Sequence, residues 1–228
     1  KTAARLAKTF RGTFVTLDET NAVYRIVLGT KDPAPKNQSI LQIDVAQIQG
    51  KDILEDLKRR DFTLNALALP LSADLPAEIP FEKILDPRGG LADIKKKSLR
   101  TESEDVIKDD PLRILRAFRI GAQLNFTIEP KTLEFLRRNR TRVTRPAGER
   151  IQAELLALLS VPGCSRWVRL MDECEVLTAL FDGLEPARQC AVVYYGEGGV
   201  LLHSLDTVAR ADFLLHNLDK AFPDLSAP

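Results

Sequence analysis

Short apolar runs separated by polar segments characterise residues 1 to about 69 of the chain. Three of these runs, at residues 13–17, 22–28 and 40–45, have the length of β-strands and alternate with helical segments. From about residue 98 onward, apolar residues recur almost without interruption at the spacing of amphipathic helices. The pattern therefore predicts an α+β fold, with a mixed first part followed by an almost purely helical part.

The clearest helical pattern begins after Asp110. Asp110 is a favourable N-cap residue, and Pro111 suits the first turn of a helix. Asp109 and Arg113 lie four residues apart, so one interpretation is a capped helix with an intrahelical ion pair. The other interpretation is a carboxylate and a guanidinium held side by side, which can hydrogen-bond the edge of a nucleobase. The pattern alone leaves both interpretations open.

Two more helices are expected in the same part of the chain. One covers residues 131–138, with Thr127 or Glu129 as its cap, and the other begins within residues 145–150. Asn125, at the end of the preceding helix, tolerates the left-handed conformation of a C-cap. The second helix has these predicted inward-facing residues: Ile151, Leu155, Leu156, Leu158 and Leu159.

Length, cysteine content and charge narrow the class of protein. The 228 residues suffice for one large or two small domains, and no apolar run is long enough to span a membrane. The three cysteines are odd in number and lack metal-binding spacing, as expected for free thiols in a reducing cytoplasm. Residues 161–228 hold five basic and ten acidic side chains, so the basic excess lies in the first 160 residues. Such an excess suits a phosphate backbone, although solubility would also explain it.

The string RRDFTLNA at residues 59–66 concentrates side chains that bind polyanions. Arginine offers a planar fork that matches phosphate oxygens. Asp61 and Asn65 lie four residues apart, on one side of a helical turn, where they could hold a ribose or a base edge. A solvated charged turn is the plainer explanation for an isolated RRD string.

Five strings together resemble the class II nucleotidyltransferases, which comprise the tRNA CCA-adding enzymes, their CC- and A-adding relatives and bacterial poly(A) polymerases. They are IDVA (43–46), EDLKRRDFTLNALA (55–68), LDPRGGLADI (85–94), DDPLRILR (109–116) and ERIQAEL (149–155). The resemblance implies the remainder of a head domain at residues 1–97, with a small antiparallel sheet and helices. A helical neck that recognises the base (98–161) and the start of a helical body (162–228) would follow. The chain itself then opens on a helix.

The resemblance also implies a reaction and a set of site residues. The family transfers C or A from CTP or ATP to an RNA 3′ end, here most simply the 3′ end of a tRNA in the cytoplasm. Asp110 and Arg113 would read the incoming base. Asp61, with Arg60 and Asn65, would hold the ribose and order the site. The remaining residues implied for this site are Arg116 and Arg150, for phosphates or neighbouring carboxylates, and Asp44, as a third carboxylate near the metals.

The sequence departs from the family in its metal-binding strings. The family begins with a Gly-Gly-x-x-x-Arg-Asp loop and an Asp-x-Asp pair, which bind triphosphate and Mg²⁺, and neither string occurs here. Two divalent ions would stabilise the attacking and leaving oxygens of the reaction. We therefore expect this chain alone to be inactive, with the carboxylates supplied by a missing amino-terminal segment or a partner chain. A non-catalytic RNA- or nucleotide-binding module, a poly(A) polymerase and a helical interaction domain remain alternatives.

A second basic cluster lies at the end of a predicted helix, and its residues are Arg137, Arg138, Arg140 and Arg142. These side chains could contact RNA, but basic residues near a helix C-terminus also complement the helix dipole. Three aromatic residues, Trp167, Tyr194 and Tyr195, could stack a base. We expect these three residues to lie in the core or at its edge.

Overall fold

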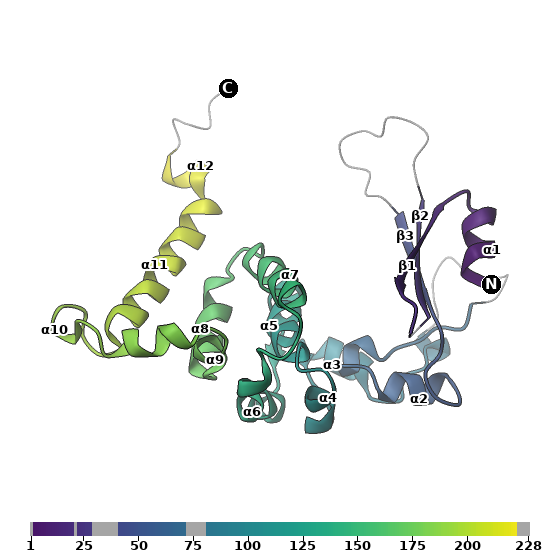
Figure 1. The fold of residues 1–228 in the computed structure, drawn as a ribbon, viewed down its shortest axis with the longest axis horizontal. Helices are drawn as coiled ribbons and strands as arrows, with labels where there is room; N and C mark the ends of the chain where they lie inside the picture. The colour runs from purple at the N-terminus through teal and green to yellow at the C-terminus, as the bar shows by residue number, and fades with distance from the viewer. Residues whose placement is uncertain (1, 21, 29–40, 72–80, 223–228) are drawn as a thin grey trace. The chain divides into compact units, whose positions relative to one another are not determined.

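The computed structural model describes residues 2–20, 22–28, 41–71 and 81–222 (Figure 1). The chain divides into two compact units, Lys1–Asp56 and Leu57–Pro228. The predicted α+β class is confirmed, with a small antiparallel sheet in the first unit and mostly helices in the second. The domain boundaries predicted after residues 97 and 161 both fall inside the second unit, and they stay predictions.

The first unit is built on a three-stranded antiparallel sheet of order β1-β2-β3. Its strands are β1 (Thr13–Asp18), β2 (Val23–Leu28) and β3 (Leu41–Ala46), close to the three predicted runs, although residue 40 lies outside the described residues. The helix α1 (Thr2–Thr9) packs on β1 and β2, and buries Ala3 and Ala7. Ile26 at the centre of β2 is completely buried, because the sheet and α1 enclose it.

The segment that follows contains α2 (Ile53–Lys58), the 3-10 helices η1 (Thr63–Asn65) and η2 (Phe81–Lys83), and α3 (Gly90–Lys95). The Asp86 carboxylate caps α3 by accepting hydrogen bonds from the backbone N–H groups of Gly90 and Leu91, at 2.7 and 3.0 Å. Gly89 has φ 73°, and a Cβ on Gly90 would collide with the Thr63 carbonyl. The glycine pair therefore lets α3 pack directly against η1.

The core of the second unit surrounds α5 (Arg113–Leu124), which packs along α7 (Gly148–Leu159). Ile114, Leu115 and Phe118 of α5 are almost fully buried. The neighbouring elements are α4 (Glu104–Asp109), α6 (Pro130–Arg138), η3 (Arg140–Arg142) and a short parallel pair, β4 (Ser98–Leu99) and β5 (Thr127–Ile128). This strand pair is an exception to the helical pattern predicted from residue 98 onward.

Helix caps and inward faces agree only partly with the predictions. Glu129 caps α6 by accepting from Thr132 N–H, and Asn125 ends α5 with φ 54°, as expected. Asp110 is not the N-cap of α5, because the helix begins three residues later and Leu112 is its N-cap; Asp110 Oδ1 instead accepts from Leu112 N–H at 3.2 Å. Leu156 and Leu159 are 57% and 48% exposed, so their predicted inward orientation is wrong. Leu158, also predicted to face inward, is 1% exposed, so that prediction is confirmed.

The end of the second unit contains α8 (Ser165–Glu173), α9 (Val176–Leu180), η4 (Asp182–Arg188), α10 (Val192–Tyr195), α11 (Gly199–Leu215) and α12 (Leu218–Ala221). Trp167 is buried, as expected, against Gly121 of α5. Tyr194 is 86% exposed and Tyr195 is 49% exposed, so their expected core positions are wrong. The ring of Tyr195 stacks on His203 instead. Among the described residues, no helix combines the length and apolar character that crossing a bilayer requires.

Candidate functional site

Six of the predicted site residues line one pocket of about 220 Å³ in the second unit. They come from three places in the chain: the turn after α2, the segment at the start of α5, and α7. The lining residues are Arg60, Asp61, Asp110, Arg113, Arg116 and Arg150. Four arginines and two aspartates give the lining a net positive charge, which suits an anionic ligand.

Asp61 is the buried centre of this pocket, with 7% of its surface exposed. Its Oδ1 accepts from Phe62 N–H at 2.8 Å and from the Asn65 amide at 3.0 Å. Its Oδ2 accepts from Arg116 Nε and Nη2 at 3.0 and 2.8 Å. Burial alone would raise the pKa of Asp61, but the charge of Arg116 and these hydrogen bonds hold that pKa below its usual value. Asn65 acts on the pocket through Asp61, because it does not line the pocket itself.

Arg116 connects Asp61 to α7. Its Nη1 donates to Glu154 Oε1 at 3.3 Å, and the other oxygen of Glu154 accepts from Arg119. Burial would lower the pKa of Arg116, but Asp61 and Glu154 raise it overall. Glu154 received no role from the sequence, although it stands four residues after Arg150 on the same helix. The spacing of four residues from Arg150 was the sequence signal for Glu154, because residues four apart lie on the same face of a helix.

Arg113 and Asp110 lie at the pocket with different partners from those expected. Arg113 donates to the carbonyl oxygens of Val106 and Arg59, at 2.9 and 3.3 Å. The structure therefore does not contain the ion pair between Asp109 and Arg113 that one of the two interpretations required. Asp110 Oδ2 accepts from Arg150 Nη2 at 3.0 Å. Both base-reading candidates thus line the same pocket as Asp61 without bonding to each other.

Arg88 does not line this pocket but bonds to the turn that carries Arg60, and no role was predicted for it. Its side chain is buried, and it donates to the Arg60 carbonyl at 2.7 Å and to Glu102 at 3.0 Å. Arg100 in turn donates to the Arg88 carbonyl at 2.6 Å and to Asp93 at 2.8 Å. The string at residues 85–94 thus holds the turn that carries Arg60 and Asp61. Only the fold brings these segments together, so no local pattern signals it.

Comparisons with known proteins agree with this geometry. The family profile "Poly A polymerase head domain" matches residues 17–100, and "Probable RNA and SrmB- binding site of polymerase A" matches residues 125–188. A CC-adding tRNA nucleotidyltransferase from Synechocystis is 36% identical over 170 residues, covering 74% of this chain and 36% of that protein. An A-adding tRNA nucleotidyltransferase from Deinococcus radiodurans is 31% identical over 231 residues, covering 97% and 46%. The chain belongs to the class II nucleotidyltransferase family.

A solved structure of another family member extends this likeness to the fold. The Thermotoga maritima CCA-adding enzyme complexed with tRNA is 30% identical, with a TM-score of 0.60. The match covers 78% of this nucleotidyltransferase chain and 40% of that one. The chain therefore spans less than half the length of these relatives.

The described residues of this nucleotidyltransferase chain contain no group of three or more His, Cys, Asp or Glu side chains placed to hold a metal ion. Asp44, the predicted third carboxylate, lies in the first unit on β3, where both of its oxygens accept from Arg25 at 2.7 and 2.8 Å. The hydrogen bond from Arg25 lowers the pKa of Asp44. Its role near a metal stays a prediction.

Three of the four arginines predicted to contact RNA form ion pairs. Arg137 and Arg140 both pair with Glu175, and Arg138 pairs with Glu134 one turn away on α6. Arg142 is half-buried and has no ion pair within the described part of the chain. RNA contact at these positions stays a prediction.

Proposed function

We propose that this chain is the nucleotide-selecting part of an enzyme that adds C or A from CTP or ATP to the 3′ end of a tRNA. The observation that carries this proposal is the single pocket shared by Asp61, Asp110, Arg113 and Arg116. The names of the relatives, CC-adding and A-adding tRNA nucleotidyltransferase, support tRNA as the RNA. A poly(A) polymerase activity is the alternative that the head-domain profile leaves open.

Asp110 and Arg113 would act as a protein template for the base. The carboxylate offers acceptors and the guanidinium offers donors, so together they can match a Watson–Crick edge. Asp110 would have to exchange Arg150 for the base. That exchange is inexpensive, since the pair is solvent-exposed, with side chains 51% and 31% exposed. Arg150 would then be released toward the phosphates of the nucleotide.

Asp61 would order the site rather than bind the ribose alone. Both of its oxygens are already engaged by Phe62, Asn65 and Arg116. Its main effect is therefore to hold the Arg116 guanidinium at the pocket. With Arg60 and Arg150, Arg116 supplies the positive charge that a triphosphate needs.

We further propose that these 228 residues alone do not catalyse the transfer. Two observations support this proposal: the sequence contains no Asp-x-Asp string, and among the described residues no three or more His, Cys, Asp or Glu side chains are grouped to hold a metal ion. Bound Mg²⁺ would supply charge stabilisation to the attacking and leaving oxygens, and its main ligands would have to come from outside this sequence.

The direct test is incorporation of labelled CTP and ATP into tRNA that ends before, within and after its CCA sequence. The protein should be produced from its complete gene. Incorporation of C, A or both at the matching primer is expected. Failure to incorporate either nucleotide would overturn the proposed function. Addition of long A tracts to unrelated RNA would favour the poly(A) polymerase alternative.

Replacing Arg113 by alanine tests the template role. We expect the preference between CTP and ATP to fall by about 10- to 100-fold in kcat/KM, as expected when one bidentate contact is lost. Arg169→Ala is the matched control, because Arg169 lies outside the pocket and pairs with Asp206. An unchanged preference in folded Arg113→Ala protein would refute the template role.

A further inference from the structure

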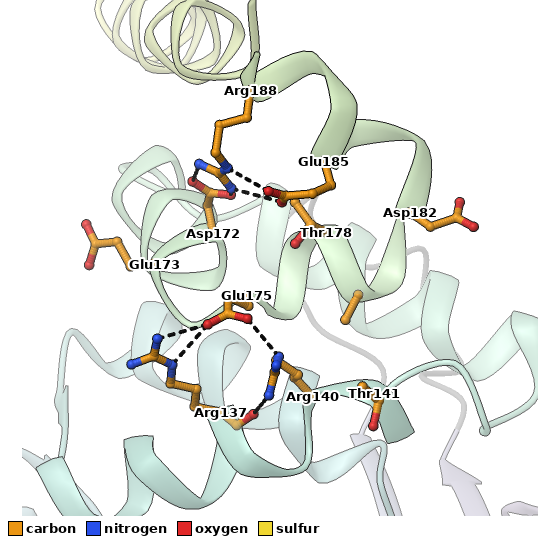
Figure 2. Close-up of a pocket in the computed structure, with 11 residues that line it drawn as sticks. Arg137, Arg140, Thr141, Asp172, Glu173, Glu175, Thr178, Asp182, Glu185 and Arg188 are labelled. Atoms are coloured by element: carbon orange, nitrogen blue, oxygen red, sulfur yellow. Dashed lines mark hydrogen bonds and ion pairs between the residues drawn. The ribbon is translucent and has the colours of Figure 1, made fainter. Parts of the chain in front are cut away.

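A second, larger pocket of about 740 Å³ lies where α6 and η3 meet α8, α9 and η4 (Figure 2). One side carries Arg137, Arg140 and Thr141 from the end of α6 and η3. The other side carries mostly acidic residues from α8 to η4, together with Arg188. The pocket lies wholly within the second unit, away from the residues that line the nucleotide pocket.

One carboxylate joins the two sides of this pocket. Glu175 Oε1 accepts from Arg137 Nη2 at 2.9 Å, and Oε2 lies 3.1 Å from Arg140 Nε. Figure 2 shows Glu175 between the two guanidinium groups. Each oxygen therefore engages one arginine, which is how two arginines also share the oxygens of one phosphate group.

The backbone at Glu175 is unusual. Its φ of 58° lies in the left-handed region, which costs a residue with a Cβ about 1 kcal/mol or more. Glu175 directly precedes α9, so this conformation turns the chain between α8 and α9. The turn points the carboxylate at the end of α6.

The other charged residues that line the pocket do not form ion pairs with Arg137 or Arg140. Asp172 and Glu185 hold Arg188, and their hydrogen bonds raise the pKa of Arg188. Glu173 and Asp182 have no ion-pair partner in the described part of the chain, and Figure 2 shows both carboxylates pointing away from the ion pairs of Glu175. No acidic residue interrupts the run from residue 137 to residue 145, which contains five arginines. Without Glu175, the guanidinium groups of Arg137 and Arg140 would have no described carboxylate bound to them, although the pocket lining as a whole holds more acidic than basic side chains.

The ion pairs of Glu175 with Arg137 and Arg140, here called the bridge, are also open to solvent. The side chains of Arg137, Glu175 and Arg140 are 54%, 42% and 35% exposed. Exposed ion pairs contribute little stability and are screened by salt, so a competing anion can replace the carboxylate at low cost. A phosphodiester is permanently charged. Thr141, which also lines the pocket, carries a hydroxyl that can donate a hydrogen bond to it.

We propose that Arg137 and Arg140 form a binding site for an RNA backbone phosphate, and that Glu175 occupies this site until RNA displaces it. The inference rests on the proposed function, because it takes RNA as the substrate. Glu175 thereby lowers the affinity for RNA and limits tight binding to any RNA.

The test is Glu175→Gln in the protein from the complete gene. This change removes the negative charge and keeps the side-chain shape. We expect RNA affinity to rise at least threefold, and the slope of log K against log salt to steepen by about 0.7–0.9 for each new phosphate contact. KM for the tRNA primer should fall, whereas KM for CTP and ATP should stay unchanged.

Two controls isolate the bridge. Glu173→Gln removes the same charge from the same pocket without touching Arg137 or Arg140, and it should change RNA affinity much less. In an Arg137→Gln, Arg140→Gln background, Glu175→Gln should have no effect on affinity. If Glu175→Gln protein fails to fold, Glu175→Asn removes the charge with a residue that suits the left-handed backbone.

Several outcomes would overturn the inference. They are unchanged or weaker RNA binding by folded Glu175→Gln protein, an equal gain from Glu173→Gln, and a gain that persists without the two arginines. If the unmodified protein still adds nucleotides to tRNA in these cases, only the phosphate site fails. If it adds neither nucleotide to any primer, the proposed function fails first.

Discussion

Asp61 and Glu175 each hold arginines, but one carboxylate is buried and the other is exposed. Asp61 is 7% exposed and uses both oxygens on Arg116, Asn65 and a backbone N–H. The Glu175 side chain is 42% exposed and contacts two arginines from the neighbouring helix end. A buried carboxylate that loses its arginine leaves an uncompensated charge, whereas an exposed one regains water. The same pair of chemical groups therefore orders one site and leaves the other open to exchange.

The pKa shifts follow the same division. For Asp61, burial opposes the charged form, and Arg116 with the hydrogen bonds outweighs it. For Glu175, the hydrogen bond from Arg137 is the largest influence that lowers the pKa, and burial matters less. The lowered pKa of Asp61 thus depends on Arg116 and the hydrogen bonds overcoming burial, whereas the lowered pKa of Glu175 depends mainly on its exposed hydrogen bond from Arg137.

Asp61→Asn should break the buried network and give the largest effect. We expect the free energy of unfolding to fall by about 3 kcal/mol, since removal of one partner leaves Arg116 only partly compensated by Glu154. Urea denaturation measures this change. Glu175→Gln is the paired control and should cost much less. Equal losses in both variants would contradict the distinction between the two sites.

Acid should remove the advantage of the unmodified protein over Asp61→Asn. The pKa of Asp61 is lowered in the folded state, so its contribution is complete above its unfolded value of about 4 and is lost as pH falls through the folded value. The difference in unfolding free energy should be constant from about pH 5 to 7 and shrink below about pH 4. Denaturation at several pH values tests this, and a difference that grows in acid would contradict it.

Arg138→Ala should have the smallest effect on stability. Arg138 pairs with Glu134 on the exposed face of α6, with side chains 58% and 48% exposed. Such i,i+4 pairs contribute about 0.5 kcal/mol or less. Thermal unfolding should therefore show a melting temperature close to that of the unmodified protein. A loss comparable to that of Asp61→Asn would show that exposure does not separate these ion pairs.

The sequence was sufficient to predict the three strands of the first unit and most helices, because their patterns are local. The residues that line the pocket around Asp61 were named together through the family resemblance, and their roles stay predictions. It could not identify the partners of Arg113, since the Val106 and Arg59 carbonyls meet it only in the folded chain. Leu156 and Tyr194 have apolar or aromatic character typical of a core, yet both are exposed. Which face of a helix is covered depends on its neighbours. The pairing of Glu175 with Arg137 of α6 and Arg140 of η3 likewise joins residues 35 to 38 positions apart.

Arg88 and Arg113, from different parts of the second unit, donate hydrogen bonds to adjacent backbone carbonyls, those of Arg60 and Arg59. The short turn between α2 and η1 is thus clamped at two consecutive points. If either guanidinium moves, the turn must move with it or the hydrogen bond must break. Arg88, which does not line the pocket around Asp61, is therefore coupled through this turn to Arg113, which does line it.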